Sequence, residues 1–234
     1  MRTAFYYDLG SPYAYLSAER ISGLFTEAGL EQPEWQPVLL GGLFQTFGRS
    51  SWGQGPDREA GMAECERRAA AYGLPPIVWP DPWPGNMLTA MRVATFAKQT
   101  GRAVSFSLAA FRQQFAAGRD LSDPDNVMIA GAACELHPRA LLKAVETKGV
   151  KEALRAATNE AASRGVEGVP AVVVGTKVFW GDDRLEEAVD AAEELGHHPV
   201  GVGAAGDRMA VGAVGPDQEV LVAHHRGGAD DRRL

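Results

Sequence analysis

The fold is decided by residues 3–40, which read TAFYYDLGSPYAYLSAERISGLFTEAGLEQPEWQPVLL. Residues 3–8 are an aromatic-rich run that predicts a short strand, and the Gly-Ser-Pro sequence at 10–12 ends it. Apolar residues at helical spacing predict a helix over residues 13–28, and a second strand follows at 35–40. A strand, a helix and a strand in so short a stretch predict a βαβ unit with parallel strands and a right-handed crossover.

Strand patterns return late in the chain. Residues 171–174 and 177–180 flank Gly175-Thr176, a two-residue turn that predicts a β-hairpin, and a final helix is expected over residues 183–195. Between the two strand regions the sequence predicts helices and turns without a strand, with helices at 57–71, 87–100, 104–117, 124–136, 139–147 and 150–164.

This order of elements predicts an α/β fold, in which a thioredoxin-like domain (βαβ…ββα) carries an inserted all-helical domain. We expect the thioredoxin-like domain to comprise residues 1–42 plus 166–196, and the helical insertion to comprise residues 43–165. Residues 197–234 are rich in Gly, Ala and Val with scattered charge, which predicts a disordered tail.

Charge and hydropathy exclude several classes of function. The chain has 23 Lys and Arg against 30 Asp and Glu, a net charge of −7, whereas a nucleic-acid-binding surface needs an excess of basic residues. No apolar run approaches the roughly 18 residues that span a bilayer, and the N-terminus lacks the apolar segment of a secretion signal. We therefore expect no nucleic-acid partner, no membrane association and a cytoplasmic location.

Cysteine and histidine usage narrows the chemistry further. Cys65 and Cys134 lie 69 positions apart and form no C-x-x-C motif, so a disulfide scaffold or a thiolate zinc site lacks ligands. Four of the five histidines fall in the last 38 residues, which leaves only His137 for a Ser-His-Asp or Cys-His site. We expect no metal site, and no dithiol exchange unless one of the cysteines reaches the active-site cleft.

The turn after the first strand is the candidate centre of the chemistry. In a thioredoxin-type domain this turn leads into a helix N-terminus, whose unpaired N–H groups and dipole favour an anion. The turn reads Ser11-Pro12-Tyr13-Ala14 and contains no sulfur, so a thiol has to come from outside. A serine hydroxyl at this place can donate to a bound thiolate and lower the pKa of that thiol.

A second part of such a site comes from Val169 and Pro170, directly before the hairpin. The sequence alone favours an ordinary proline at the start of a strand, because cis X-Pro bonds are the minority in folded proteins. A cis bond would instead present the Val169 N–H and C=O to an extended peptide.

Four segments, in matching order and spacing, carry a resemblance to a known family. They are FYYDLGSPYAYLSAERI (5–21), PVLLGGLF (37–44), PGNMLTAMRVATFA (84–97) and GVEGVPAVVVGTKVFWGDDRLEEA (165–188). Over residues 3–195 the chain resembles the 2-hydroxychromene-2-carboxylate isomerases, within the group of kappa-class glutathione transferases and DsbA-like proteins. The resemblance implies a thioredoxin fold with a helical insertion, a homodimer, and the use of glutathione.

Carried over by position, the resemblance assigns the thiol-binding residues. Ser11 matches the serine that hydrogen-bonds the glutathione sulfur, and it also suits a helix cap. Val169 matches the residue whose main chain pairs with the cysteinyl part, and Pro170 matches the family's cis proline. Asp182 and Asp183 match the pair that holds the γ-glutamyl end, with N-capping of the last helix as the alternative.

Three further residues are assigned to the substrate side. Trp180 is expected to line the cleft, with core packing as the alternative, and Asn86 matches a family asparagine, with helix capping as the alternative. Arg49 stands where the family commonly has an asparagine after glycine, at a position that contacts thiol cofactor or acidic substrate in relatives. Because of this departure and the Ala-, Gly- and Arg-rich composition, the identity of the thiol stays open: it is either glutathione or another low-molecular-weight thiol.

We therefore predict a glutathione-dependent isomerase of an aromatic-catabolic intermediate such as 2-hydroxychromene-2-carboxylate, with a small aromatic substrate and no metal. A bound thiolate would add reversibly to a conjugated carbon, rotation about the resulting single bond would follow, and elimination would release the isomer. Two alternatives stay open. One is a kappa-like glutathione transferase that uses the same thiolate, and the other is a non-enzymatic thioredoxin-like binding protein in which Ser11 only caps a helix.

Overall fold

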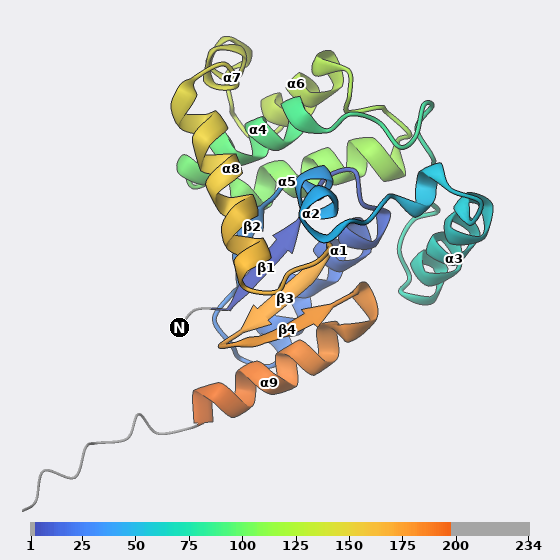
Figure 1. Cartoon of the computed structure of the whole chain (residues 1–234), viewed down its shortest axis with the longest axis vertical. Coiled ribbons are helices and arrows are strands. Elements are labelled where there is room, and N and C mark those ends of the chain that lie inside the picture. The colour runs from blue at the N-terminus through green and yellow to red at the C-terminus, as the bar shows by residue number, and fades with distance from the viewer. Residues whose placement is uncertain (1–2, 198–234) are drawn as a thin grey trace, which may run out of the picture. The chain divides into compact units, whose positions relative to one another are not determined.

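One mixed sheet organises the protein in the computed structural model, which describes residues 3–197 (Figure 1). Its strands are β1 (Ala4–Tyr7), β2 (Glu34–Pro37), β3 (Ala171–Val174) and β4 (Lys177–Trp180), in the spatial order β2-β1-β3-β4. The β1 and β2 strands run parallel, while β3 is antiparallel to both of its neighbours, β1 and β4. Pairing of β1 with β3 places the turn that follows β1 beside the segment that precedes β3, although the two are far apart in sequence.

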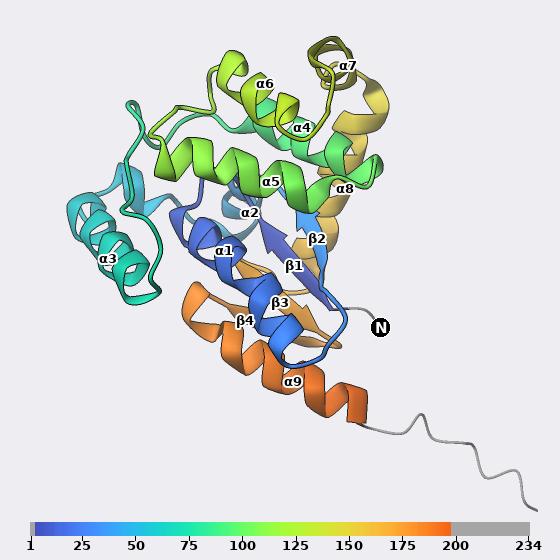
Figure 2. The ribbon, with the colours of Figure 1, turned by 180° about the vertical axis from the view of Figure 1, so that it is seen from behind.

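The two faces of the sheet follow from the alternation of side chains along each strand. Phe5 and Tyr7 of β1 belong to the apolar cluster under α1 (Pro12–Glu27) and α9 (Leu185–His197). The alternate residues Ala4 and Tyr6 belong to a second cluster under α2 (Leu40–Phe47) and α8 (Lys148–Ser163). Figure 2 shows α1 lying across the sheet on the face opposite to α2 and α8.

The segment between β2 and β3 is helical, as the sequence predicts. Besides α2 and α8 it contains a 3-10 turn (Trp52–Gln54), α3 (Arg58–Ala71), α4 (Leu88–Gln99), α5 (Ala103–Phe111) with a π-helical turn (Arg112–Ala116), α6 (Pro124–Ala132) and α7 (Pro138–Ala144). The apolar side chains of α4 and α5 join the cluster that contains Phe5, so the sheet and the helical segment share one core. No helix within residues 3–197 is long and apolar enough to cross a membrane.

The predicted fold class is confirmed, and the differences lie at the ends of elements and in α2, a helix absent from the predicted set. The second strand, expected over residues 35–40, ends at Pro37, because Leu40 already begins α2. This helix has the apolar residue Leu39 at its N-cap, and the Asp8 carboxylate accepts from the Leu40 N–H instead (Oδ2–N distance 2.8 Å). A cap supplied from 32 residues away leaves no local signal in the sequence.

The predicted boundary between the two domains falls inside α2, and the division at 42/43 and 165/166 stays a prediction. Of the predicted tail, only His197 is described, as the last residue of α9. The remaining tail residues, 198–234, lie outside the described part of the chain, and so do three of the five histidines.

Candidate active site

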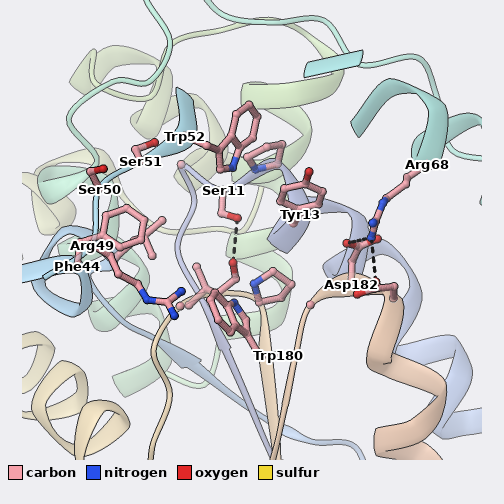
Figure 3. A pocket seen from close by; sticks show the side chains of 18 of the residues that line it. Ser11, Tyr13, Phe44, Arg49, Ser50, Ser51, Trp52, Arg68, Trp180 and Asp182 are labelled. Atoms are coloured by element: carbon pink, nitrogen blue, oxygen red, sulfur yellow. Dashed lines mark hydrogen bonds and ion pairs between the residues drawn. The ribbon is translucent and has the colours of Figure 1, made fainter. Parts of the chain in front are cut away.

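A cavity of about 520 Å³ opens where β1 leads into α1 (Figure 3). Its walls come from the first turn of α1, from α2 and the loop that follows it, and from the segments on either side of the β3–β4 hairpin. Seven of the eight residues predicted for the site line this cavity: Ser11, Arg49, Val169, Pro170, Trp180, Asp182 and Asp183. The fold therefore brings together residues that lie up to 172 positions apart, Ser11 and Asp183.

Ser11 caps α1 and faces the cavity at the same time. Its backbone is extended (φ −92°, ψ 116°), and its Oγ accepts from the Ala14 N–H at 3.2 Å. The hydroxyl also donates to the Val169 carbonyl, with a long O–O distance of 3.4 Å. Pro12 has no N–H and the Ala14 N–H is bonded to Ser11, so the Tyr13 N–H is the donor that the first turn leaves for a ligand.

Val169 faces Ser11 across the cavity. The Val169–Pro170 peptide bond is cis, as the resemblance implies, and the sequence-only preference for an ordinary strand-start proline is wrong. The Pro170 carbonyl accepts from the Gly181 N–H at 3.0 Å, which ties this segment to the end of β4. Within residues 3–197 the Val169 N–H has no hydrogen-bond partner, so it is available to an extended ligand.

A charged cluster lies at one end of the cavity, on the right in Figure 3. Asp182 is only 1% exposed, and its carboxylate accepts from Arg68 Nη1 at 2.8 Å and from the Tyr72 hydroxyl at 2.9 Å. Burial raises the pKa of Asp182, while the hydrogen bond from Tyr72 and the charge of Arg68 act in the opposite direction. Arg68 also pairs with Glu64 of its own helix, at 2.7 Å.

These contacts separate the roles of the two aspartates. The capping alternative is wrong for Asp182, because its carboxylate binds two side chains of the α3 region rather than the N-terminus of α9. The side chain of Asp183 is 58% exposed and lies 3.6 Å from Arg68. Asp182 therefore holds Arg68 in place, and Asp183 offers a carboxylate to the cavity.

The opposite end of the cavity carries Arg49 and Trp180 (Figure 3). The Arg49 guanidinium lies over the Trp180 ring, 4.5 Å from its centroid, and forms an ion pair with Glu167 at 2.7 Å. Trp180 is 42% exposed, so the alternative of plain core packing is wrong for this residue.

Asn86 does not line the cavity. It is exposed, and its Oδ1 accepts from the Leu88 N–H at the start of α4, at 3.0 Å. This is the helix-end role that the sequence offers as the alternative, and we do not carry Asn86 into the proposed site.

Sequence reasoning missed Arg68 and the aromatic wall of the cavity. Arg68 lies 57 positions after Ser11 on α3, a helix whose buried residues are Cys65 and Ala69, and no local pattern marks it as a partner of Asp182. The aromatic wall consists of Tyr13, Trp52 and Trp83, with ring centroids 5.9 Å and 5.1 Å apart in that order. The density of Trp and Pro in residues 75–86 was the available signal for the last of these.

Neither cysteine lines the cavity. Cys65 is fully buried on α3 beside Tyr13, and burial raises the pKa of its thiol to about 12, so it stays protonated. Cys134 is half-buried, follows the end of α6 and packs against the apolar core. In residues 3–197 no group of three His, Cys, Asp or Glu side chains could hold a metal ion.

Comparisons with known proteins agree with this geometry. The sequence profile of the DSBA-like thioredoxin domain matches residues 3–193. The chain belongs to this family. Within it, the chain is 28% identical to 2-hydroxychromene-2-carboxylate isomerase of Sphingobium xenophagum over 188 residues, which is 78% of this chain and 93% of the relative.

Two solved structures have the same fold as this chain. A 2-hydroxychromene-2-carboxylate isomerase superimposes with a TM-score of 0.75 at 22% identity, over 83% of this chain and 96% of that one. A probable DsbA oxidoreductase from Streptomyces coelicolor gives a TM-score of 0.66 at 21% identity, over 85% and 92% of the two chains. The predicted family and the prediction of an isomerase are confirmed.

Proposed function

We propose that this protein is a glutathione-dependent isomerase of a small aromatic acid of the 2-hydroxychromene-2-carboxylate type. The observation that carries the proposal is the placement of Ser11 at the N-terminus of α1, inside a cavity that neither cysteine lines. It lies opposite the Val169 N–H, which has no hydrogen-bond partner among residues 3–197. The curated relative bears the name of this isomerase, which supports the choice of reaction.

The charges around Ser11 match the ends of glutathione. On one side, Asp183 and Arg68 are complementary to the ammonium and carboxylate groups of a γ-glutamyl end. On the other side, Arg49 is complementary to a carboxylate of the thiol or of the substrate. A cysteine between these ends would place its sulfur near Ser11 and its main chain near Val169. A thiol without charged ends would make none of these contacts with the charged groups of the cavity.

Ser11 and the helix N-terminus would activate the thiol. The long bond from the Ser11 hydroxyl to the Val169 carbonyl is easily exchanged for a bond to a thiolate, and the Tyr13 N–H adds a second donor. A thiol whose pKa falls from about 8.5 to about 6.5 has its anion stabilised by about 2.7 kcal/mol. Two donors at a helix N-terminus are of the right magnitude for this shift.

The chemistry would then consist of addition, rotation and elimination. The thiolate forms a C–S bond to the conjugated carbon, and the displaced π electrons move to the oxygen at the end of the conjugated system. The former double bond is now single and rotates. Return of the electrons expels the thiolate and restores the double bond, so the thiol is regenerated without net oxidation.

The test is a calorimetric titration with reduced glutathione, followed by a spectrophotometric assay of 2-hydroxychromene-2-carboxylate isomerisation. We expect saturable one-to-one binding and turnover that depends on the thiol. Asp183→Ala should raise the Kd for glutathione about five- to tenfold through loss of a charged contact, whereas Asp190→Ala, on the exposed side of α9, should not. No binding at millimolar glutathione, or turnover without thiol, would refute the proposal.

The same proposal includes a homodimer and a cytoplasmic location, where low-molecular-weight thiols are kept reduced. Sedimentation analysis at micromolar protein concentration tests the dimer, and a mass of one chain of 25.0 kDa would contradict it.

A further inference from the structure

Arg49 reaches the mouth of the cavity because of the way α2 ends. Gly48 takes the left-handed conformation (φ +63°) at the C-cap, and the Arg49 N–H donates to the Phe44 carbonyl at 2.9 Å. This turn directs the chain out of the helix and places the Arg49 side chain against Trp180 on the opposite wall. A cation at this point also suits the negative end of the helix dipole.

Two contacts hold the guanidinium in place. One face lies over the Trp180 ring, at 4.5 Å, and Nη2 pairs with Glu167 Oε2 at 2.7 Å. Trp180 in turn packs closely on Gly168, where a Cβ would approach the ring to within 2.8 Å. Glu167, next to Gly168, thus bridges the two walls of the cavity through Arg49.

The guanidinium retains donors for a ligand. An arginine side chain has five N–H donors, and within residues 3–197 only Nη2 of Arg49 has a hydrogen-bond partner. The side chains of Arg49 and Glu167 are 40% and 42% exposed, so water screens their attraction. A second carboxylate can therefore bind to Arg49 beside Glu167 or displace it. The negative charge of Glu167 opposes this binding and raises the Kd of the ligand.

We propose that Glu167 is a specificity-determining residue of the cavity, which competes with a ligand carboxylate for the guanidinium of Arg49. The inference rests on the proposed function, because it assumes a ligand that carries a carboxylate at this end of the cavity. That carboxylate belongs either to the glycyl end of glutathione or to the aromatic substrate. Both offer the same chemistry, and the experiment distinguishes them.

Calorimetric titration compares glutathione with its glycyl ethyl ester, which lacks the carboxylate in question. Glu167→Gln should tighten the binding of glutathione about three- to fivefold, the range of an exposed ion pair, and leave the Kd of the ester unchanged. Arg49→Gln should weaken glutathione binding and make glutathione and ester equal. Glu146→Gln removes one exposed carboxylate that pairs with Lys151 at 2.7 Å, away from the cavity, and serves as the matched control.

If the carboxylate belongs to the substrate, Glu167→Gln should lower the Michaelis constant for the chromene carboxylate about three- to fivefold at saturating thiol, and leave the affinity for glutathione unchanged. If Glu167→Gln weakens the binding of glutathione and of the ester equally, the inference is overturned. Glu167 would then only hold the cavity wall in place and would not compete with a ligand carboxylate. No change in any of these constants would overturn it as well.

Failure of the proposed function is a separate outcome. If the wild-type protein binds no glutathione, the same variants are titrated with 2-hydroxybenzoate and 2-hydroxybenzamide, which differ in the carboxylate. Glu167→Gln should then tighten the binding of 2-hydroxybenzoate alone. Binding of both compounds that is indifferent to Glu167 and Arg49 would overturn the inference.

Discussion

Ser11 combines in one hydroxyl the two roles that its place in the sequence suggests, a helix cap and a ligand contact. The Oγ accepts from the Ala14 N–H and still carries a proton that points to the Val169 carbonyl across the cavity. Because the cap uses the oxygen lone pair and the ligand uses the proton, the two roles do not exclude each other.

Ser11→Ala should lower the isomerase turnover at least tenfold, because it removes the side-chain donor to the thiolate. The lost cap should reduce the free energy of unfolding by about 1 kcal/mol. Activity assays and urea denaturation measure both effects. Thr147→Ala, which removes the hydroxyl cap of α8 away from the cavity, is the matched control for the loss of a cap. Turnover of Ser11→Ala equal to that of Thr147→Ala would remove Ser11 from the mechanism.

Asp8 is a buried carboxylate directly before the Ser11 turn. It is 3% exposed, and its two oxygens accept from the Gly10 and Leu40 N–H groups, each at 2.8 Å. Burial raises its pKa to about 6, against which the two hydrogen bonds act. The carboxylate thereby connects the start of α1 with the start of α2.

The raised pKa of Asp8 predicts a definite pH dependence of stability. The folded state binds the proton more tightly than the unfolded state, so the contribution of Asp8 is fully present below about pH 4. It is lost as the pH rises through about 6, and amounts to about 3 kcal/mol. Urea denaturation between pH 4 and 7 should therefore show a smaller decline for Asp8→Asn than for the wild type. The control Asp190→Asn should show the same decline of unfolding free energy with pH as the wild type. An equal decline in Asp8→Asn would contradict the claim that Asp8 contributes to it.

At the scale of elements, the cavity depends on a close approach between two segments at the edge of the sheet. The chain before β3 passes so near the Trp180 ring of β4 that only glycine fits at position 168. The adjacent Val169 and Pro170 line the cavity, and Arg49 packs on the Trp180 ring from the opposite wall, so a shift of Trp180 disturbs both.

Gly168→Ala should therefore displace Trp180 and lower turnover at least tenfold, with a loss of unfolding free energy of about 1–3 kcal/mol from overpacking. Gly23→Ala is the control, because a Cβ at Gly23 in α1 meets no atom within 4 Å. Alanine there should stabilise the helix by about 0.5–1 kcal/mol and leave activity unchanged. Wild-type turnover of Gly168→Ala would show that the contact with Trp180 is dispensable.

At the scale of the whole described chain, the sheet and the helical segment form one core. The Tyr7 hydroxyl of β1 lies 2.6 Å from the Ser107 hydroxyl of α5, and the Tyr7 ring packs on Phe111, with centroids 5.9 Å apart. Such contacts couple the unfolding of the two segments, although the sequence predicts them as separate domains.

We expect one cooperative thermal transition, and a loss of about 3–5 kcal/mol of unfolding free energy for Phe111→Ala, because Phe111 is fully buried. Circular dichroism follows the helices, and tryptophan fluorescence follows the five tryptophans, of which Trp35 and Trp180 lie in the sheet. Leu142→Ala is the control: Leu142 is 53% exposed, so this change should lower the unfolding free energy only slightly. Two separate transitions, with only one shifted by Phe111→Ala, would show that the domains unfold independently.

The order of elements was predictable from the sequence because its signals are local. The aromatic-rich run of β1, the helical spacing in α1 and the Gly175-Thr176 turn each depend on residues within a few positions of one another. Ser11 and Val169 were predictable from the resemblance, which preserves positions along the chain.

The partners across the cavity were decided by tertiary structure alone. Arg68 meets Asp182, and Arg49 meets Trp180 and Glu167, only because the pairing of β1 with β3 brings segments that are distant in sequence to one place. The same holds for Asp8, which caps a helix 32 positions away. Periodicity reports which face of an element is buried, but not which charged side chain from another element is packed against it, and that choice sets the electrostatics of the site.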